Sequence, residues 1–229
     1  MSNLPTGIHE FLGAAGWAGA EISPLTGDAR FRRYFRLHHD GKSAMLMTAP
    51  ADEKPREFLD VARWLIAHEV RAPQILAEDL DDGWILIEDF GDDRMRDWLD
   101  DNPAGEEAAY AAAIDTLVHL HAKPAGPFPP YDEPTYLREA KLLTEWYCPA
   151  LGLDVDAQGF EVAWREVLAP LTGNPRADVT VLRDYHAENI MLLRPQDGPG
   201  EQGVIDFQDA LVGHPAYDLV SLLQDARRD

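Results

Sequence analysis

A polar segment enclosed by short apolar runs, late in this 229-residue chain, most constrains its fold. The apolar runs occupy 179–182, 190–193 and 203–205, and a turn rich in proline and glycine occupies 195–200. Apolar runs of this length bounded by Pro and Gly predict β-strands, and the turn predicts that the last two strands pair as a hairpin. Asp184 and Asn189 precede this hairpin and Asp206 follows it. We therefore expect three oxygen-bearing side chains at one end of the hairpin.

The residue types at these three positions suit the transfer of a phosphoryl group. Mg²⁺ is a hard, strongly hydrated ion that prefers oxygen ligands, so Asn189 and Asp206 are candidate metal ligands. Asp184 is the candidate catalytic base, because a loose transition state needs an oriented nucleophile and a late proton acceptor more than a strong base. The alternative, a surface hairpin with merely solvated acidic residues, is disfavoured by the spacing beside apolar strands.

Three segments carry a resemblance to a known family. They are 184–189 (Asp-Tyr-His-Ala-Glu-Asn), 205–210 (Ile-Asp-Phe-Gln-Asp-Ala) and 213–219 (Gly-His-Pro-Ala-Tyr-Asp-Leu). Together they resemble the aminoglycoside phosphotransferase and choline kinase superfamily, a small-molecule branch of the protein-kinase fold. The Phe-Gln-Asp-Ala run and the segment 217–227 further resemble bacterial anomeric amino-sugar kinases, which phosphorylate N-acetylmuramate and N-acetylglucosamine in cell-wall recycling.

The resemblance implies an α+β, protein-kinase-like bilobal fold. A small antiparallel-sheet N-terminal lobe (1–88) would bind nucleotide, and a mainly helical C-terminal lobe (89–229) would be catalytic. ATP and Mg²⁺ are the implied cofactors, and Asp218 is the implied buried acceptor that braces the catalytic loop. Related kinases continue for several helices beyond the segment matching 217–219. The C-terminal helices are therefore expected to be missing, as in a truncated form or a kinase with an unusually open acceptor site.

Two departures from the family pattern concern the predicted site. The family usually opens its catalytic loop with His-Gly-Asp, whereas this chain has Leu-Arg-Asp at 182–184. The third-strand Lys that pairs the α- and β-phosphates is absent, and Met47 occupies its expected position. The nearby cations that could replace it are Arg30, Arg32, Arg33 and Lys42. An Arg fork can bind phosphate at two points, and amino-sugar kinases also tend to lack this Lys, so the loss favours that branch.

The sequence of the N-terminal half indicates further residues that could contact the nucleotide. Strands are predicted at 22–25, 34–37, 75–78 and 84–88, and a helix with one apolar face is predicted to begin at Pro55. Gly27 and Arg30 belong to a predicted turn that suits a hairpin covering phosphates, although an ordinary hairpin fits equally well. The strand pattern breaks at Glu88 and Phe90, which we interpret as a hinge whose backbone N–H and C=O groups bind adenine.

Two polar residues beside the central motif are further candidates. His186 lies inside the catalytic loop, where it could orient Asp184 or contact substrate, although a hydrogen bond to a backbone carbonyl is equally consistent with its position. Asp209 lies three residues after Asp206. We assign it a substrate-binding role in preference to a capping role.

Two segments, 110–121 and 160–168, have apolar residues at helical spacing and are predicted to form core helices. His119 and His121 lie two residues apart in the first of them. On a helix they point to nearly opposite sides, so they cannot chelate one metal ion. The resemblance instead implies that His121 packs under the catalytic loop.

The composition excludes several classes of protein. A net charge of −21 and a pI near 4.6 disfavour nucleic acid and anionic membrane as partners. Cys148 is the sole cysteine, so no disulfide framework can form and a reducing cytoplasm is expected. Residues 1–10 lack the basic and apolar regions of a signal peptide, and no run approaches a membrane span. We expect a cytoplasmic protein with nucleotide and small-molecule partners.

The predicted function is an ATP- and Mg²⁺-dependent small-molecule kinase acting on a sugar hydroxyl. The resemblance implies the anomeric hydroxyl of N-acetylmuramate or N-acetylglucosamine. An aminoglycoside or choline kinase is one alternative, because acidic residues could line a pocket for a cationic acceptor. A nucleotide-binding pseudokinase is another, because the Lys is missing, but a binding module has no need for Asp184 together with two metal ligands. A Ser/Thr protein kinase is disfavoured, since no segment ending in Ala-Pro-Glu follows Asp206.

Overall fold

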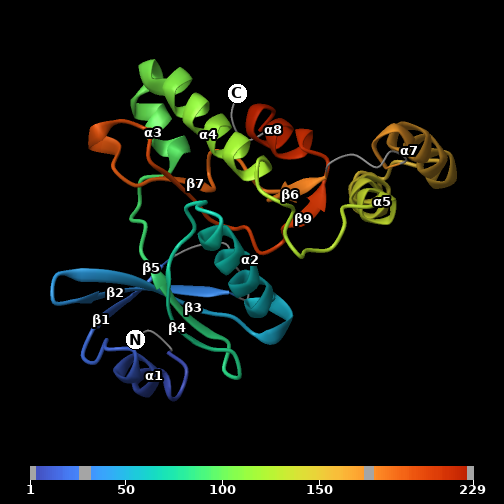
Figure 1. Cartoon of the computed structure of the whole chain (residues 1–229). Coiled ribbons are helices and arrows are strands. Elements are labelled where there is room, and N and C mark those ends of the chain that lie inside the picture. The colour runs from blue at the N-terminus through green and yellow to red at the C-terminus, as the bar shows by residue number, and fades with distance from the viewer. Residues whose placement is uncertain (1–3, 26–31, 173–177, 226–229) are drawn as a thin grey trace.

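An antiparallel sheet of five strands forms the first of two lobes (Figure 1). The computed structural model describes residues 4–25, 32–172 and 178–225. The strands are β1 (Glu21–Pro24), β2 (Arg33–His39), β3 (Lys42–Thr48), β4 (Ile75–Asp79) and β5 (Trp84–Glu88), in the order β1-β2-β3-β5-β4. Two helices accompany them, α1 (Ile8–Ala14) and α2 (Pro55–Ala67). The four strands predicted in this lobe are confirmed, and β3 completes the sheet.

The two faces of the sheet are buried by different helices. Side chains alternate along β2, so Phe35 and Leu37 share one face, where they join Ile8 of α1 in an apolar cluster. The opposite face carries Met47 and Ile85, which pack with α2. The same face continues beyond α2 and forms the roof of the cleft between the lobes.

The helix α2 begins at Pro55, as predicted from the fixed φ and missing N–H of proline. Its buried apolar residues recur at helical spacing: Phe58, Leu59, Val61, Ala62 and Leu65. Each large apolar side chain buried here contributes about 1.5–3 kcal/mol. A 3₁₀ turn (Ala51–Glu53) and Lys54, whose φ is 55°, precede the helix. Lys54 thereby reaches Asp209 in the second lobe.

The second lobe is mainly helical. Its helices are α3 (Met95–Asp101), α4 (Glu106–His121), α5 (Glu133–Leu142), α6 (Cys148–Ala150), α7 (Ala157–Thr172) and α8 (Ala216–Leu223). A π-helical turn (Leu143–Tyr147) joins α5 to α6, and 3₁₀ turns occupy Pro103–Gly105 and Pro195–Asp197. Two antiparallel pairs of strands complete the lobe, β6 (Val179–Val181) with β9 (Leu211–Gly213) and β7 (Ile190–Leu192) with β8 (Gln202–Val204). The β7–β8 pair is the predicted hairpin.

The buried face of α4 agrees with the predicted one except at Val118, since Ala113 and Leu117 are buried and Tyr110 and Ile114 pack against the core. We expected Val118 on the core face, but its side chain is 63% exposed. The buried residues are Ala109, Ala113, Leu117 and Leu120. Tyr185 donates a hydrogen bond to the carbonyl of Ala113 at 2.9 Å, so a small side chain is needed where the catalytic loop approaches. Val118 is next to Leu117 in sequence but about 100° away around the helix, so it lies at the margin of the apolar stripe, where neighbouring segments decide burial.

The prediction that 160–168 belongs to a core helix is wrong. The helix α7 forms, but Leu168 is its one buried residue and Val167 is 63% exposed. It packs beside α5 at the edge of the second lobe, away from the sheet (Figure 1). Helical spacing of apolar residues reveals a stripe along a helix, whereas the neighbours of the helix decide how much of that stripe is buried.

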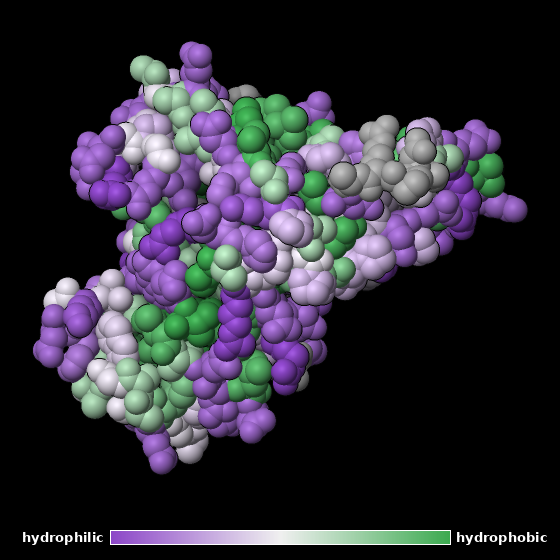
Figure 2. Space-filling model, in the orientation of Figure 1, coloured by the Kyte–Doolittle hydropathy of each residue, from purple (hydrophilic) through white to green (hydrophobic). Residues whose placement is uncertain are grey.

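The surface carries exposed apolar side chains in the second lobe. Figure 2 shows a hydrophobic patch over α8, where Leu219, Val220 and Leu223 are 37–56% exposed. The same view shows a notch between the two lobes at its left side. No helix in the described ranges combines the length and the hydropathy that a membrane crossing requires.

Candidate active site

Asp218 holds the first turn of the catalytic loop, which spans 182–189 between β6 and β7. It is fully buried and accepts hydrogen bonds from the backbone N–H groups of Leu182 at 2.7 Å and Arg183 at 2.9 Å. Burial raises the pKa of Asp218 to about 7, although the two N–H groups act in the opposite direction; the charge of Asp184 also raises it. Asp218 is therefore the buried acceptor that the family resemblance implied.

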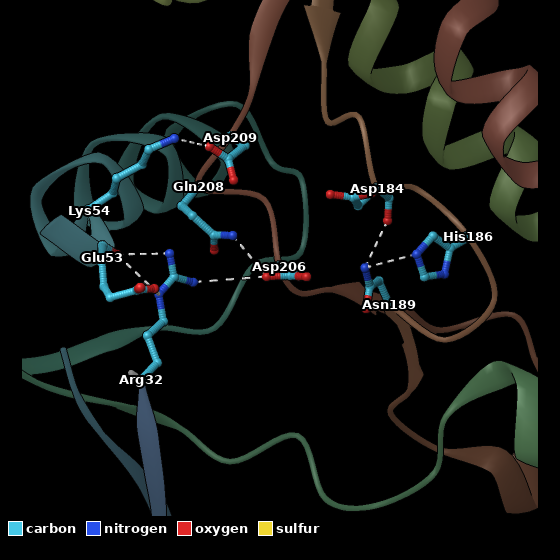
Figure 3. Close-up of polar contacts among 9 residues, drawn as sticks. All are labelled: Arg32, Glu53, Lys54, Asp184, His186, Asn189, Asp206, Gln208 and Asp209. Carbon is cyan, nitrogen blue, oxygen red and sulfur yellow. Dashed lines mark hydrogen bonds and ion pairs between the residues drawn. The ribbon is translucent and has the colours of Figure 1, made fainter. Parts of the chain in front are cut away.

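The side-chain amide of Asn189 lies between Asp184 and His186 (Figure 3). Its Nδ2 donates to the backbone carbonyl of Asp184 at 3.0 Å and lies 3.3 Å from Nε2 of His186. Because Nδ2 faces the loop, Oδ1 is the atom of Asn189 that can bind a cation. His186 is 5% exposed, and its Nδ1 lies 3.9 Å from the carboxylate of Asp225. The imidazole thus contacts Asn189 from the protein interior.

The β7–β8 hairpin brings Asp206 next to Asn189, as the spacing predicted. Ile205 donates its backbone N–H to the carbonyl of Asn189 at 3.0 Å, and Asp206 follows directly. The φ of Asp206 is 59°, in the left-handed region that Asp tolerates better than most residues. Its side chain is 50% exposed and accepts a hydrogen bond from Gln208 at 2.8 Å.

Asn189 and Asp206 fit Mg²⁺ by the chemistry of their side chains. One amide oxygen and one half-exposed carboxylate lie at the ends of neighbouring strands. Mg²⁺ is usually bound by one or two protein carboxylates, with waters and substrate phosphates as the other ligands. Such a pair can therefore serve a Mg²⁺ ion that arrives with nucleotide.

A cleft of about 950 Å³ lies between the sheet and the β7–β8 hairpin. The predicted site residues that line it are Arg32, Arg33, Glu88, Phe90, Asn189 and Asp206. The described lining does not include Asp184, His186 or Asp209. Gly27 and Arg30 fall outside the residues that the structure describes. Met45, Ile87 and Met191 give the cleft an apolar surface suited to a flat aromatic ring.

Arg32 connects the first lobe to Asp206 (Figure 3). Its Nε and Nη2 donate to the backbone carbonyl of Glu53 at 3.1 and 2.8 Å, and Nε lies 3.7 Å from the Glu53 carboxylate. Its Nη1 lies 3.9 Å from Oδ1 of Asp206. The guanidinium of Arg33 instead lies 5.0 Å from the ring centre of Phe35. Of the two described Arg candidates, Arg32 is the one beside a predicted metal ligand.

The position of the missing Lys is buried. Met47 is 0% exposed and packs with α2, whereas Lys42 lies at the far end of β3, opposite His39. Sequence reasoning missed a further cation, Arg36, which lines the cleft and contacts the carboxylate of Asp89 at 2.9 Å. Its alternation with Tyr34 along β2 was the available signal, because both residues belong to the cleft face.

Glu88 does not offer its backbone N–H to a ligand, contrary to the predicted hinge geometry. This N–H donates to the carbonyl of Gln74 at 2.9 Å. The Glu88 carboxylate accepts a hydrogen bond from Arg71 at 2.7 Å, and this contact lowers the pKa of the carboxyl group. Both groups hold β5 against the segment before β4. The strand ladder therefore ends at Glu88, as predicted, and includes the first residue of the predicted hinge.

Phe90 occupies the hinge between the lobes. Its ring centre lies 4.8 Å from the guanidinium of Arg71 and the ring packs on Gly203, where an added Cβ would approach it to 2.5 Å. No described residue forms a hydrogen bond with the backbone N–H or C=O of Phe90. This residue can therefore supply the donor and acceptor that we predicted for adenine.

Asp209 pairs with Lys54, the second cation that sequence reasoning missed (Figure 3). Burial raises the pKa of Asp209. The hydrogen bond and charge of Lys54, together with the charge of Arg183, lower it by more, so the pKa lies below its ordinary value. Asp209 is thus ionised and compensated. It contacts Lys54 and lies on the opposite side of Asp184 from His186 (Figure 3).

The fold and the site agree with what the chain resembles. A family model described as phosphotransferase enzyme family matches residues 21–229. The chain is 35% identical over 260 residues to an N-acetylmuramate/N-acetylglucosamine kinase of Caulobacter vibrioides, which covers 95% of this chain and 70% of the relative. It is 36% identical over 233 residues to a kinase of the same name from Pseudomonas aeruginosa, with 97% and 66% covered. The chain thus spans about two thirds of the length of these curated relatives.

Solved structures share the fold at low sequence identity. A streptomycin–ATP ternary complex of the aminoglycoside phosphotransferase APH(2")-IIa has a TM-score of 0.68 at 18% identity, covering 96% of this chain and 76% of that one. A choline/ethanolamine kinase family protein from Mesorhizobium loti has a TM-score of 0.65 at 17% identity, covering 97% and 69%. The predicted α+β kinase-like fold is confirmed. This chain belongs to the phosphotransferase enzyme family.

Proposed function

We propose that this protein is an ATP- and Mg²⁺-dependent kinase that transfers the γ-phosphoryl group to the anomeric hydroxyl of N-acetylmuramate or N-acetylglucosamine, sugars released in cell-wall recycling. The observation that carries the proposal is the arrangement of Asp184, Asn189 and Asp206 around one loop and one hairpin. The names of the curated relatives supply the acceptor sugars.

Asp184 orients the acceptor hydroxyl and accepts its proton late in the reaction, because the transition state for phosphoryl transfer is loose. The hydrogen bond that the Asn189 side chain donates to the backbone carbonyl of Asp184 ties Asp184 to the end of the hairpin that carries the proposed metal ligands. Asn189 and Asp206 would hold Mg²⁺, which when bound offsets the negative charge of the ATP phosphates. His186 positions Asn189 and does not itself touch the reacting atoms.

Arg32 takes the role of the absent third-strand Lys. Its contacts with Glu53 resemble the Lys–Glu pair of the protein-kinase template, and its Nη1 points toward Asp206. A guanidinium held in this way provides several N–H donors for phosphate oxygens without further ordering. At the other end of the cleft, the backbone of Phe90 binds the adenine edge.

An aminoglycoside or choline acceptor is less consistent with the charges around Asp184. Asp209 pairs with Lys54, and Glu139 of α5 pairs with Arg183. A cationic acceptor gains little from carboxylates that are already paired with cations. A neutral acceptor does not depend on an unpaired carboxylate.

A coupled assay of ADP release with ATP and Mg²⁺ tests the proposal. The acceptor panel is N-acetylmuramate, N-acetylglucosamine, an aminoglycoside, choline and homoserine, with Asp184→Asn as the inactive control. We expect turnover with one or both amino sugars and none above the control with the others. Turnover with only an aminoglycoside or choline would show that the proposed acceptor is wrong and that the protein phosphorylates a cationic acceptor instead. Nucleotide binding without turnover on any acceptor would favour a pseudokinase.

A further inference from the structure

A cluster of aromatic and charged side chains lies near Asp184 and outside the lining of the nucleotide cleft. Its members, the acceptor-side cluster, are Tyr131, Tyr136, Glu139, Arg183 and Tyr217. The rings of Tyr131 and Tyr136 stack at a centroid distance of 3.9 Å, and Tyr217 lies 4.8 Å from Tyr131. None of the five lines the nucleotide cleft as described. In-line transfer puts the acceptor and the leaving oxygen on opposite sides of the phosphorus, so this cluster faces the acceptor.

Arg183 immediately precedes Asp184 and has an unfavourable backbone conformation. Its φ is 72°, in the left-handed region that favours glycine. A non-glycine residue there costs about 1–3 kcal/mol and persists because the surroundings hold it. Here Asp218 binds its N–H at 2.9 Å. An arginine at a position that favours glycine indicates a function for the side chain.

The guanidinium of Arg183 is held in place, but within the described part of the chain not all of its N–H donors have hydrogen-bond partners. Its Nη2 lies 2.6 Å from Oε1 of Glu139, and its Cζ lies 5.9 Å from the ring centre of Tyr131. The other oxygen of Glu139 accepts the hydroxyl of Tyr131. Glu139 therefore satisfies one of the five guanidinium N–H donors. The Nε–H group is buried and has no hydrogen-bond partner among the described residues, so it is not the donor that a ligand meets. The side chain as a whole is 25% exposed, so solvent and ligands reach other parts of it.

The two proposed acceptors differ by one charged group. N-acetylmuramate is N-acetylglucosamine with a lactyl ether at O3, and this ether ends in a carboxylate. A chain with a net charge of −21 repels such an anion unless a cation lies at the site. A guanidinium matches a carboxylate with two parallel N–H donors, which the more exposed ammonium of Lys54 cannot do.

We infer that Arg183 is a specificity-determining residue whose guanidinium binds the lactyl carboxylate of N-acetylmuramate, while Glu139 and Tyr131 hold it in place. The inference rests on the proposed function. It adds a subsite for an anionic acceptor group beside the catalytic base. N-acetylglucosamine, which lacks the carboxylate, makes no use of this contact.

The test compares acceptors within each variant. The kcat/KM values are measured at saturating ATP for N-acetylmuramate, its uncharged methyl ester and N-acetylglucosamine. In Arg183→Gln, kcat/KM for N-acetylmuramate should fall about 10- to 100-fold, the loss expected for a charged hydrogen bond, and about threefold or less for the two uncharged acceptors. Arg183→Lys, which keeps the charge, should show a ratio of kcat/KM for N-acetylmuramate to kcat/KM for N-acetylglucosamine between those of wild type and Arg183→Gln. Arg138→Gln, an exposed position on α5, removes the same charge and should leave the ratio unchanged.

Other outcomes are decisive in different ways. An equal loss on all three acceptors would mean that Arg183 only positions Asp184, and would overturn the inference. A wild-type protein that phosphorylates the methyl ester as well as N-acetylmuramate would overturn it too. If Arg183→Gln does not fold, Arg183→Gly decides, because glycine suits the φ of 72° at this position and carries no guanidinium. It should lose the same share of kcat/KM for N-acetylmuramate relative to N-acetylglucosamine, and an unchanged ratio of the two values contradicts the inference. Wild-type protein inactive on both sugars would instead remove the proposed function.

Discussion

The ring of Phe58 in α2 stacks on the ring of Phe207, with the centroids 5.1 Å apart and the planes inclined by 20°. Both side chains are almost fully buried. Phe207 directly follows Asp206, and Phe58 also lines the nucleotide cleft. The position of α2 is therefore coupled to that of a proposed metal ligand.

Replacing Phe58 by Leu should weaken Mg-ATP binding several-fold and lower the free energy of unfolding by about 1–2 kcal/mol, because it removes the stacked ring and leaves a smaller side chain. Leu59→Val is the control, since Leu59 is fully buried on the same helix and should lose stability without losing nucleotide affinity. Calorimetric titration with Mg-ATP and urea unfolding measure the two effects. Equal affinities in both variants would show that stability alone is affected.

The three polar residues of the motif should separate into two phenotypes. Asp184→Asn should lower kcat by about 10²–10⁴ and leave Mg-ATP affinity nearly intact, because Asp184 acts on the acceptor hydroxyl. Asp206→Asn should weaken Mg-ATP binding itself, because it removes a carboxylate ligand. Asp197→Asn, exposed on the turn of the same hairpin, is the matched control and should behave like wild type. Normal turnover in both site variants would disprove the assignment.

Arg32 and Arg33 should differ, although they are adjacent in sequence. Arg32→Ala should raise the KM for ATP or lower kcat by about tenfold or more, since charged hydrogen bonds to phosphate are lost. Arg33→Ala should have a small effect, because the guanidinium of Arg33 lies over Phe35. Steady-state kinetics at varied ATP and saturating acceptor distinguish them. Equal effects would exclude Arg32 as the substitute for the absent Lys.

Gly203→Ala should disturb the hinge. Its Cβ would approach the Phe90 ring to 2.5 Å, a distance at which one group must move. We expect a several-fold higher Kd for ATP and a lower Tm. Gly200→Ala is the control, because an added Cβ there meets nothing within 4 Å. Unchanged ATP affinity in Gly203→Ala would show that the binding of adenine does not depend on the position of Phe90.

Asp218 should make stability depend on pH. Burial raises its folded-state pKa to about 7 from an ordinary value of 3.8, so in this window the folded protein holds a proton that the unfolded chain has released. Its contribution to the free energy of unfolding should therefore decline as pH rises from about 4 to 7 and then stay constant, by a few kcal/mol at most. Urea unfolding of wild type and Asp218→Asn across pH 5–8 measures this. A pH-independent difference between the two proteins would contradict the assignment.

The spacing of residues along the sequence was enough to predict much of the structure around Asp184. Asp184, Asn189 and Asp206 lie within one loop and one hairpin, so the alternation of apolar runs with turn residues was enough to bring them together. The start of α2 at Pro55 and the strands of the first lobe follow from equally local rules. Their conformations depend on neighbours a few residues away, and those neighbours are visible in the sequence.

The tertiary structure decided which distant side chains join the site. Lys54 meets Asp209 across 155 positions, Arg183 meets Glu139 across 44, and Arg32 is selected over Arg33 by Glu53 and Asp206. Packing also decided that α7 is exposed and that the N–H of Glu88 belongs to the sheet. The periodicity of a sequence shows which face of a segment is apolar or charged. It does not show which other segment covers that face, because a contact stabilises the fold only when both segments are in position, and this depends on how all segments pack together.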